Sequence, residues 1–293
     1  MLAWFVGRRH ALAMNKLSLE KRTQLLACLV EGNSMRSTSR MTGVSMSTVV
    51  KFVADVGRIC SDYQDRTFVN LKCRRLQCDE IWSFVGAKEK NVSKEQKGNG
   101  WGDAWTWVAI DTETKLVPCW FVGPRNAEAA NHFMHDLADR LSSRVQLTTD
   151  GLKAYIGAVD NAFKNDVDFA QLVKIYGAAP SGDARYSPAQ CMGTRKAAMT
   201  GTPDVKHIST SYIERQNLTM RMNMRRFTRL TNAHSKKLEN HEHAIALFYM
   251  HYNFCRVHAT LKTTPAVAAG VCDRVWTLAD IADLLDVAER LAA

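Results

Sequence analysis

Residues 75 to 85 read Arg75-Leu-Gln-Cys-Asp-Glu-Ile-Trp-Ser-Phe-Val85, a mostly apolar run with two adjacent acids in its middle. Alternation along the run predicts a β-strand, with Asp79 and Ile81 on one face and Glu80 and Trp82 on the other. Only one of the two acids is then expected to face a given metal ion, and the pattern leaves open which one. The alternative for Asp79 is a strand-edge acid paired with an arginine.

Two further acids stand at the ends of predicted elements. Asp150 follows the apolar run Val145-Gln-Leu-Thr-Thr149, at the carboxyl end of a predicted strand, where open α/β sheets bind ligands. Glu214 opens a basic predicted helix that contains Arg221. A helix N-cap for Asp150 and a solvated charged face for Glu214 are the alternatives. Unpaired buried carboxylates are costly, so the three acids predict two divalent cations about 3.5–4 Å apart.

The elements around these acids predict an α/β fold. Strands are expected at 76–85, 105–111, 117–122, 145–149 and 169–176, and helices at 126–141 and 151–163. A long turn is expected at 88–102 and a loop at 178–206. Later helices are expected from 209 through 229, at 237–253 and at 277–291. This order is that of a ribonuclease-H-like fold, an α/β (α+β) mixed sheet with helices on both faces.

Residues 15–63 show the pattern of an all-α helix-turn-helix domain. A short predicted helix is closed by Gly43, and Ser45 is placed to cap the next helix. That helix would direct three side chains towards a DNA major groove, with two arginines of the preceding helix beside them: Ser47, Thr48, Lys51, Arg36 and Arg40. An ordinary three-helix bundle is the alternative.

Charge points to a polyanionic partner. The 293 residues carry a formal net charge of +10 with a pI near 9.3, which favours nucleic acid, although a merely basic protein is the alternative. Four arginines follow Glu214 and outnumber the acids around them, so we expect them to contact DNA phosphates: Arg221, Arg225, Arg226 and Arg229.

Cysteine spacing and hydropathy exclude other classes. The eight cysteines form no C-x-x-C pair and are read as reduced thiols of a cytoplasmic protein. Residues His241, His243, His251, Cys255 and His258 lack structural-zinc spacing, so no zinc is expected. No apolar run approaches the roughly 18 residues of a membrane span.

The expected domain division has five parts. Residues 1–13 read as a non-essential extension, since Met14 directly precedes a well-formed domain start. The helix-turn-helix domain then occupies 15–63, a linker 64–73, the catalytic domain 74–265 and a helical tail 266–293.

Three motifs resemble the insertion-sequence-one family of bacterial transposases, within the DDE transposase and integrase class. They are Cys78-Asp-Glu-Ile-Trp-Ser-Phe-Val85, Thr149-Asp-Gly-Leu-Lys-Ala-Tyr155 and Tyr212-Ile-Glu-Arg-Gln-Asn-Leu218. The resemblance implies that Asp79, Asp150 and Glu214 bind two Mg²⁺ or Mn²⁺ ions and are catalytic, with Asp79 preferred to Glu80. Arg221 matches the catalytic basic residue that often follows the glutamate. Members of this family often carry a cysteine zinc finger before the helix-turn-helix, which this chain lacks.

The expected function is therefore a DNA transposase. It would cleave at the ends of an insertion sequence and join the freed 3′-hydroxyl to target DNA. Its expected partners are the element ends and target duplex, bound by a homodimer or higher oligomer at the nucleoid of a bacterial cytoplasm. A non-catalytic helix-turn-helix regulator and a structure-specific nuclease are the alternatives. Only the transposase would form joined product.

Overall fold

A computed structural model describes residues 16–177, 190–228 and 231–292 of the chain. The expected extension at 1–13, Met14 and Arg229 lie outside the described residues.

Six strands form one mixed sheet in the order β3-β2-β1-β4-β5-β6. β1 lies antiparallel to β2 and parallel to β4, and β5 is parallel to β4 and antiparallel to β6. The bounds are β1 Arg75–Val85, β2 Gly102–Asp111, β3 Trp120–Gly123, β4 Val145–Thr149, β5 Val167–Tyr176 and β6 Cys191–Thr200. The predicted α/β class with a mixed sheet is confirmed.

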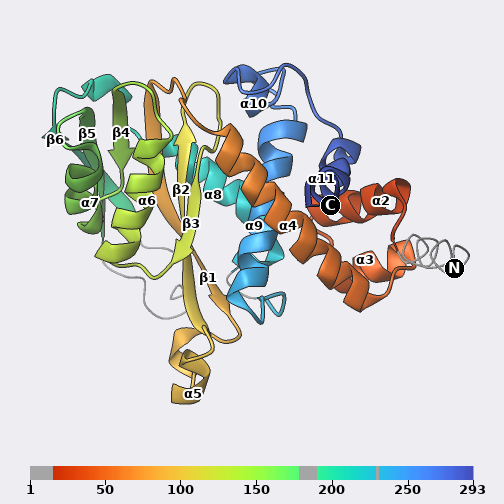
Figure 1. The fold of residues 1–293 in the computed structure, drawn as a ribbon. Coiled ribbons are helices and arrows are strands. Elements are labelled where there is room, and N and C mark those ends of the chain that lie inside the picture. Colours follow the sequence, from red (N-terminus) through yellow and green to blue (C-terminus); the bar gives the residue numbers. More distant parts are fainter. Residues whose placement is uncertain (1–15, 178–189, 229–230, 293) are drawn as a thin grey trace, which may run out of the picture.

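Helices cover both faces of the sheet, as Figure 1 shows. Helices α6 (Ala127–Asp139) and α7 (Ala154–Phe163) pack against even-numbered β1 residues such as Cys78. Helices α8 (Ser211–Asn223) and α9 (Leu238–Met250) pack against odd-numbered residues such as Ile81. The alternation of β1 therefore separates two apolar cores, and Asp79 lies on the α8 side.

Three helices lie where the sequence analysis expected a helix-turn-helix domain. They are α2 (Leu19–Val30), α3 (Met35–Thr42) and α4 (Met46–Thr67). Gly43 ends α3 in a left-handed conformation with φ of 71°, and the Ser45 hydroxyl accepts a hydrogen bond from the Thr48 N–H at 3.3 Å as the α4 cap. α4 continues to Thr67, so the residues expected to begin a linker at 64 are helical.

These N-terminal helices pack on the rest of the chain. A Cβ atom on Gly57 of α4 would come within 2.4 Å of the His243 carbonyl oxygen of α9, which leaves room only for glycine at this crossing. Helix α11 (Leu278–Ala292) returns to α2, where Arg22 pairs with Asp286 at 2.6 Å. The C-terminal helix therefore packs against the N-terminal ones. The five-part domain division made from the sequence stays a prediction.

Two further expectations about secondary structure were wrong. Residues 191–200, expected in a loop, form β6; this edge strand is largely exposed, and its apolar residues do not alternate with polar ones as they do in a half-buried strand. The long helix expected through Arg229 ends at Asn223 and is followed by the 3₁₀ turn η4 (Arg225–Phe227). The turn buries Phe227 in the apolar core between the sheet and helices α8 and α9. Burial of this side chain favours a break in the helix.

The remaining elements are short. They are η1 (Glu89–Asn91), α5 (Lys94–Lys97), η3 (Val205–His207), the π-helical turn η5 (His251–Cys255) and α10 (Pro265–Ala268). Among the described residues, none of the helices combines the length and apolar character needed to cross a membrane.

Candidate active site

Three carboxylates meet where β4 ends. Asp79, Glu80 and Asp150 each place an oxygen within 4.8 Å of the others. Cys78 and Thr149 are the last paired residues of the parallel β1 and β4, so the following residues of the two strands emerge side by side. The predicted pairing of Asp79 with Asp150 is thus present in the geometry.

Glu80 belongs to the same group, which corrects the expectation that only one of the adjacent acids could face the site. Asp79 and Glu80 still point to opposite faces of β1, but β4 ends before this point, so no strand separates the two faces on that side of β1. Asp150, at the open end of β4, can therefore approach both acids. The Glu80 side chain is 1% exposed, and its Oε1 makes no hydrogen bond within the described part of the chain.

Arg125 partly neutralises the group. Its Nε donates to Glu80 Oε2 at 2.9 Å, and its Nη2 lies 3.8 Å from Asp150 Oδ2. The guanidinium also lies over the Trp105 ring, 4.9 Å from its centroid. Sequence reasoning missed Arg125, because the segment between β3 and α6 carries no pattern that marks it.

Helix α8 is docked onto β1 by two side chains that the sequence analysis also missed. Gln77 is buried, and its Oε1 accepts hydrogen bonds from the N–H groups of Tyr212 and Ile213 at 2.8 and 3.1 Å. One turn further along α8, Asn217 Nδ2 donates to Asp79 Oδ2 at 2.9 Å. These contacts set the position of the helix face that carries Glu214.

Glu214 lies beside the group of three acids but is not part of it. Its Oε1 accepts hydrogen bonds from Lys174 Nζ, at 2.6 Å, and from the buried Thr210 hydroxyl. Its negative charge still helps to raise the pKa of Asp79. The structure therefore brings all three predicted acids into one region, with Glu214 paired to a lysine.

The electrostatics of the group suit a cation. Burial, followed by the charges of Glu80 and Asp150, raises the pKa of Asp79 to about 7. Burial also raises the pKa of Glu80, and the neighbouring Tyr155 and Arg125 side chains offset this rise only in part. Within the described residues, the Tyr155 hydroxyl lies too far from ideal geometry to form a hydrogen bond. The raised pKa values show that the neighbouring basic side chains do not fully compensate these closely spaced carboxylates. Carboxylate oxygens are the ligands that Mg²⁺ and Mn²⁺ prefer. The donor set fits such an ion.

The predicted basic residues after Glu214 divide by their surroundings. Arg221 is exposed in the last turn of α8, two turns beyond Glu214, and Arg225 is exposed in η4. Arg226 instead donates to the Ser235 hydroxyl at 2.7 Å and to the Asn240 carbonyl at 3.3 Å, and burial lowers its pKa to about 10. Arg226 therefore holds neighbouring segments together.

The residues expected to contact DNA from α3 and α4 lie mostly on open surface. Arg36, Arg40, Ser47 and Lys51 are exposed, and Thr48 is half-buried. Lys51 pairs with Asp55 of its own helix at 2.6 Å. Ser45 serves as the cap described above, so its hydroxyl already has a structural role.

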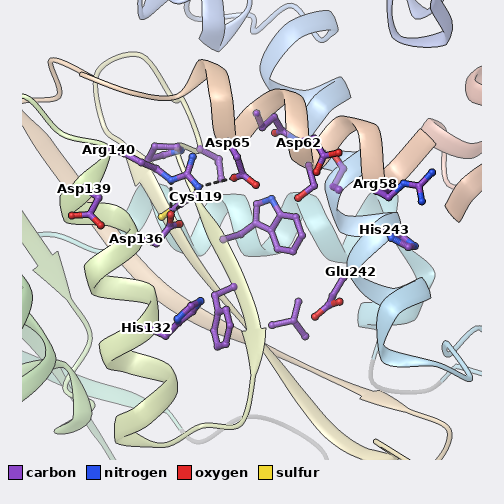
Figure 2. Close-up of a pocket in the computed structure, with 18 of the residues that line it drawn as sticks. Arg58, Asp62, Asp65, Cys119, His132, Asp136, Asp139, Arg140, Glu242 and His243 are labelled. Carbon is purple, nitrogen blue, oxygen red and sulfur yellow. Dashed lines mark hydrogen bonds and ion pairs between the residues drawn. The ribbon is translucent and has the colours of Figure 1, made fainter. Parts of the chain in front are cut away.

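A cavity of about 630 Å³ lies elsewhere, between α4, β3, α6 and α9. Figure 2 shows Arg140 with Asp65 and Asp136 at one end, and Glu242 and His243 at the other. Arg140 Nη2 lies 2.7 Å from Asp65 and 2.8 Å from Asp136. None of the candidate catalytic acids lines this cavity.

No known protein family and no curated protein matches the sequence. Among solved structures, the chain is similar to a pre-cleavage Mos1 transpososome, at 10% sequence identity and a TM-score of 0.31. The match covers 94% of this chain and 80% of the other chain. A likeness at this level carries no argument about function.

Proposed function

We propose that the chain is a metal-dependent DNA transposase of the DDE class, with a ribonuclease-H-like core. The observation that carries the proposal is the meeting of Asp79, Glu80 and Asp150 at the end of β4, beside an α8 face that presents Glu214. The central strand order β3-β2-β1-β4-β5, with helices on both faces, supports this assignment of the core. From the three sequence motifs around Asp79, Asp150 and Glu214, we propose that the chain belongs to the insertion-sequence-one family of transposases.

Asp79 and Asp150 would hold divalent ions, Mg²⁺ or Mn²⁺, with Glu214 as a further ligand. Such ions activate a water and stabilise the leaving oxygen of a phosphodiester. Asn217 and the backbone N–H of Glu80 orient the Asp79 carboxylate, to which they donate at 2.9 Å each. Arg125 limits the repulsion between Glu80 and Asp150 and keeps both in place.

Arg221 is the candidate phosphate contact of the reaction. It lies seven residues after Glu214, which on a helix places it on the same face about 10 Å away along the axis. Arg225, in the following turn, would add affinity that does not depend on DNA sequence. Recognition of the element ends would fall to the exposed side chains of α3 and α4, including Arg36, Arg40 and Ser47.

The test is a metal-dependent cleavage and joining assay on labelled duplexes that carry the sequences flanking the gene. We expect cleavage followed by joined product with Mg²⁺ or Mn²⁺. Glu214→Gln should remove both steps while DNA affinity is retained. Cleavage without joined product would favour a nuclease, and DNA binding without either step would favour a regulator. The same complexes, weighed in solution, would test the proposed homodimer or higher oligomer.

A further inference from the structure

The ammonium group of Lys174 forms an ion pair with Glu214, one of the proposed metal ligands. Its Nζ is 2.6 Å from Glu214 Oε1. Burial lowers the pKa of Lys174, but the ion pair with Glu214 and the more distant charge of Asp79 outweigh that effect and raise it. A positive charge from the protein itself is therefore present where a bound cation would contact Glu214.

The path of β5 explains how Lys174 reaches the site. The pairing of β4 with β5 ends at Thr149 and Gln171, and beyond that point β5 is paired only with β6. A Cβ atom on Gly151 would lie 3.2 Å from the Val173 side chain, so this part of β5 passes directly beside the loop that carries Asp150. The β5–β6 ribbon thereby delivers Lys174 to the open end of β4.

The two basic residues at the site are held with different strength. Arg125 is itself 38% exposed, but it lies over the Trp105 ring and donates to Glu80, a carboxylate that is only 1% exposed. Lys174 and Glu214 are 32% and 40% exposed, and ion pairs this open to water contribute only about 0–1 kcal/mol. Lys174 is therefore the partner that a stronger cation can displace.

The balance of charges at the site also favours displacement of Lys174. Four carboxylates (Asp79, Glu80, Asp150 and Glu214) face two cations, Arg125 and Lys174. With all groups ionised, two negative charges remain, which one divalent ion would balance. A second divalent ion would be accommodated more easily if the lysine left.

We propose that Lys174 is a displaceable counter-ion of Glu214 that competes with the divalent metal and moves to a DNA phosphate when substrate binds. This inference rests on the proposed function of the site. Lys174 acts as a positioning residue: while its ammonium holds Glu214, the carboxylate stays outside the group formed by Asp79, Glu80 and Asp150. Binding of DNA would free Glu214 and so favour assembly of the complete metal site on substrate.

The experiment is a calorimetric titration of the full chain with Mn²⁺, first without DNA. Lys174→Ala should tighten Mn²⁺ binding on the order of tenfold, because a unit charge is removed within a few ångströms and a ligand is freed. Lys174→Arg should bind Mn²⁺ like the wild type. The matched control is Lys196→Ala, which removes the same charge from the adjacent strand, where Nζ donates to the Val205 carbonyl; its Mn²⁺ affinity should change less than twofold.

The second arm repeats the titration with duplex DNA present. DNA should tighten Mn²⁺ binding more in the wild type than in Lys174→Ala, because linked binding requires the lysine to gain a phosphate as it loses Glu214. Thermal unfolding of each variant without metal confirms that it is folded.

The outcomes separate the two proposals. Unchanged Mn²⁺ affinity in folded Lys174→Ala, with binding that disappears in Asp150→Asn, overturns the role of Lys174 and leaves the proposed function intact. Mn²⁺ binding that survives Asp150→Asn overturns the proposed metal site, and the inference about Lys174 with it.

Discussion

Two acidic regions of this basic protein differ in how their charges are compensated. The cavity beside β3 is lined by five acids and two arginines, and Arg140 pairs there with both Asp65 and Asp136. The group at the end of β4 has fewer acids, yet burial and neighbouring charges raise the pKa of Asp79 to about 7. The contrast teaches that close spacing and burial of the carboxylates, rather than the number of acids, distinguish a candidate cation site.

The largest expected effect tests this contrast directly. Asp150→Asn should abolish Mn²⁺ binding at the site and reduce cleavage by about a thousandfold or more, as losses of residues that act as a unit do. Asp139→Asn, which removes one charge from the cavity, is the control and should leave both unchanged. Calorimetry and a cleavage time course measure the two effects. Equal losses in the two variants would end the distinction between the regions.

The next effect compares the arginine of each region. Arg140→Met and Arg125→Met should each lower the free energy of unfolding by about 2 kcal/mol, because each leaves acids without their partner. Saturating Mn²⁺ should restore the stability of Arg125→Met alone, since a metal ion can replace the lost charge only at the proposed site. Urea unfolding with and without Mn²⁺ provides the measurement. Rescue of Arg140→Met as well would contradict the comparison.

The smallest effect concerns pH. The pKa of Asp79 is about 7 in the folded chain, against an ordinary value of 3.8 that we take for the unfolded chain. As pH rises, Asp79 therefore ionises in the unfolded chain before it ionises in the folded one. Its contribution to stability is full below pH 3.8 and is lost as pH rises towards 7. Without metal, Asp79→Asn should therefore gain stability over this interval and be more stable than the wild type by about 1–2 kcal/mol at pH 8, reduced from the full linkage value because the side chain is partly open to water.

Thermal or urea unfolding between pH 4 and pH 8 follows the difference between the two proteins. Asp136→Asn serves as the comparison in the cavity, where loss of the contact with Arg140 should destabilise the chain at pH 8. A gain for Asp79→Asn that stays constant from pH 4 to pH 8 would show that the charge of Asp79 is not its cause.

Local patterns in the sequence were sufficient for much of the fold. Alternation predicted β1 and the position of Asp79, and a short apolar run predicted β4 with Asp150 at its end. Gly43 predicted the end of α3, and Ser45 predicted the start of α4. Each of these features depends on residues close together in the chain, so their effect can be read without knowing what packs against them.

The sequence by itself determined the α/β class, the strands that carry two of the acids and the net positive charge of the chain. Only the tertiary structure decided that Glu80 joins Asp79 and Asp150, that Arg125 and Lys174 supply the opposing charges, and that Arg226 bonds to the protein itself. These contacts join residues that lie far apart along the chain or beyond the end of an element. Their energies arise from burial and charge proximity, which are properties of the packed molecule and leave no periodic trace in the sequence.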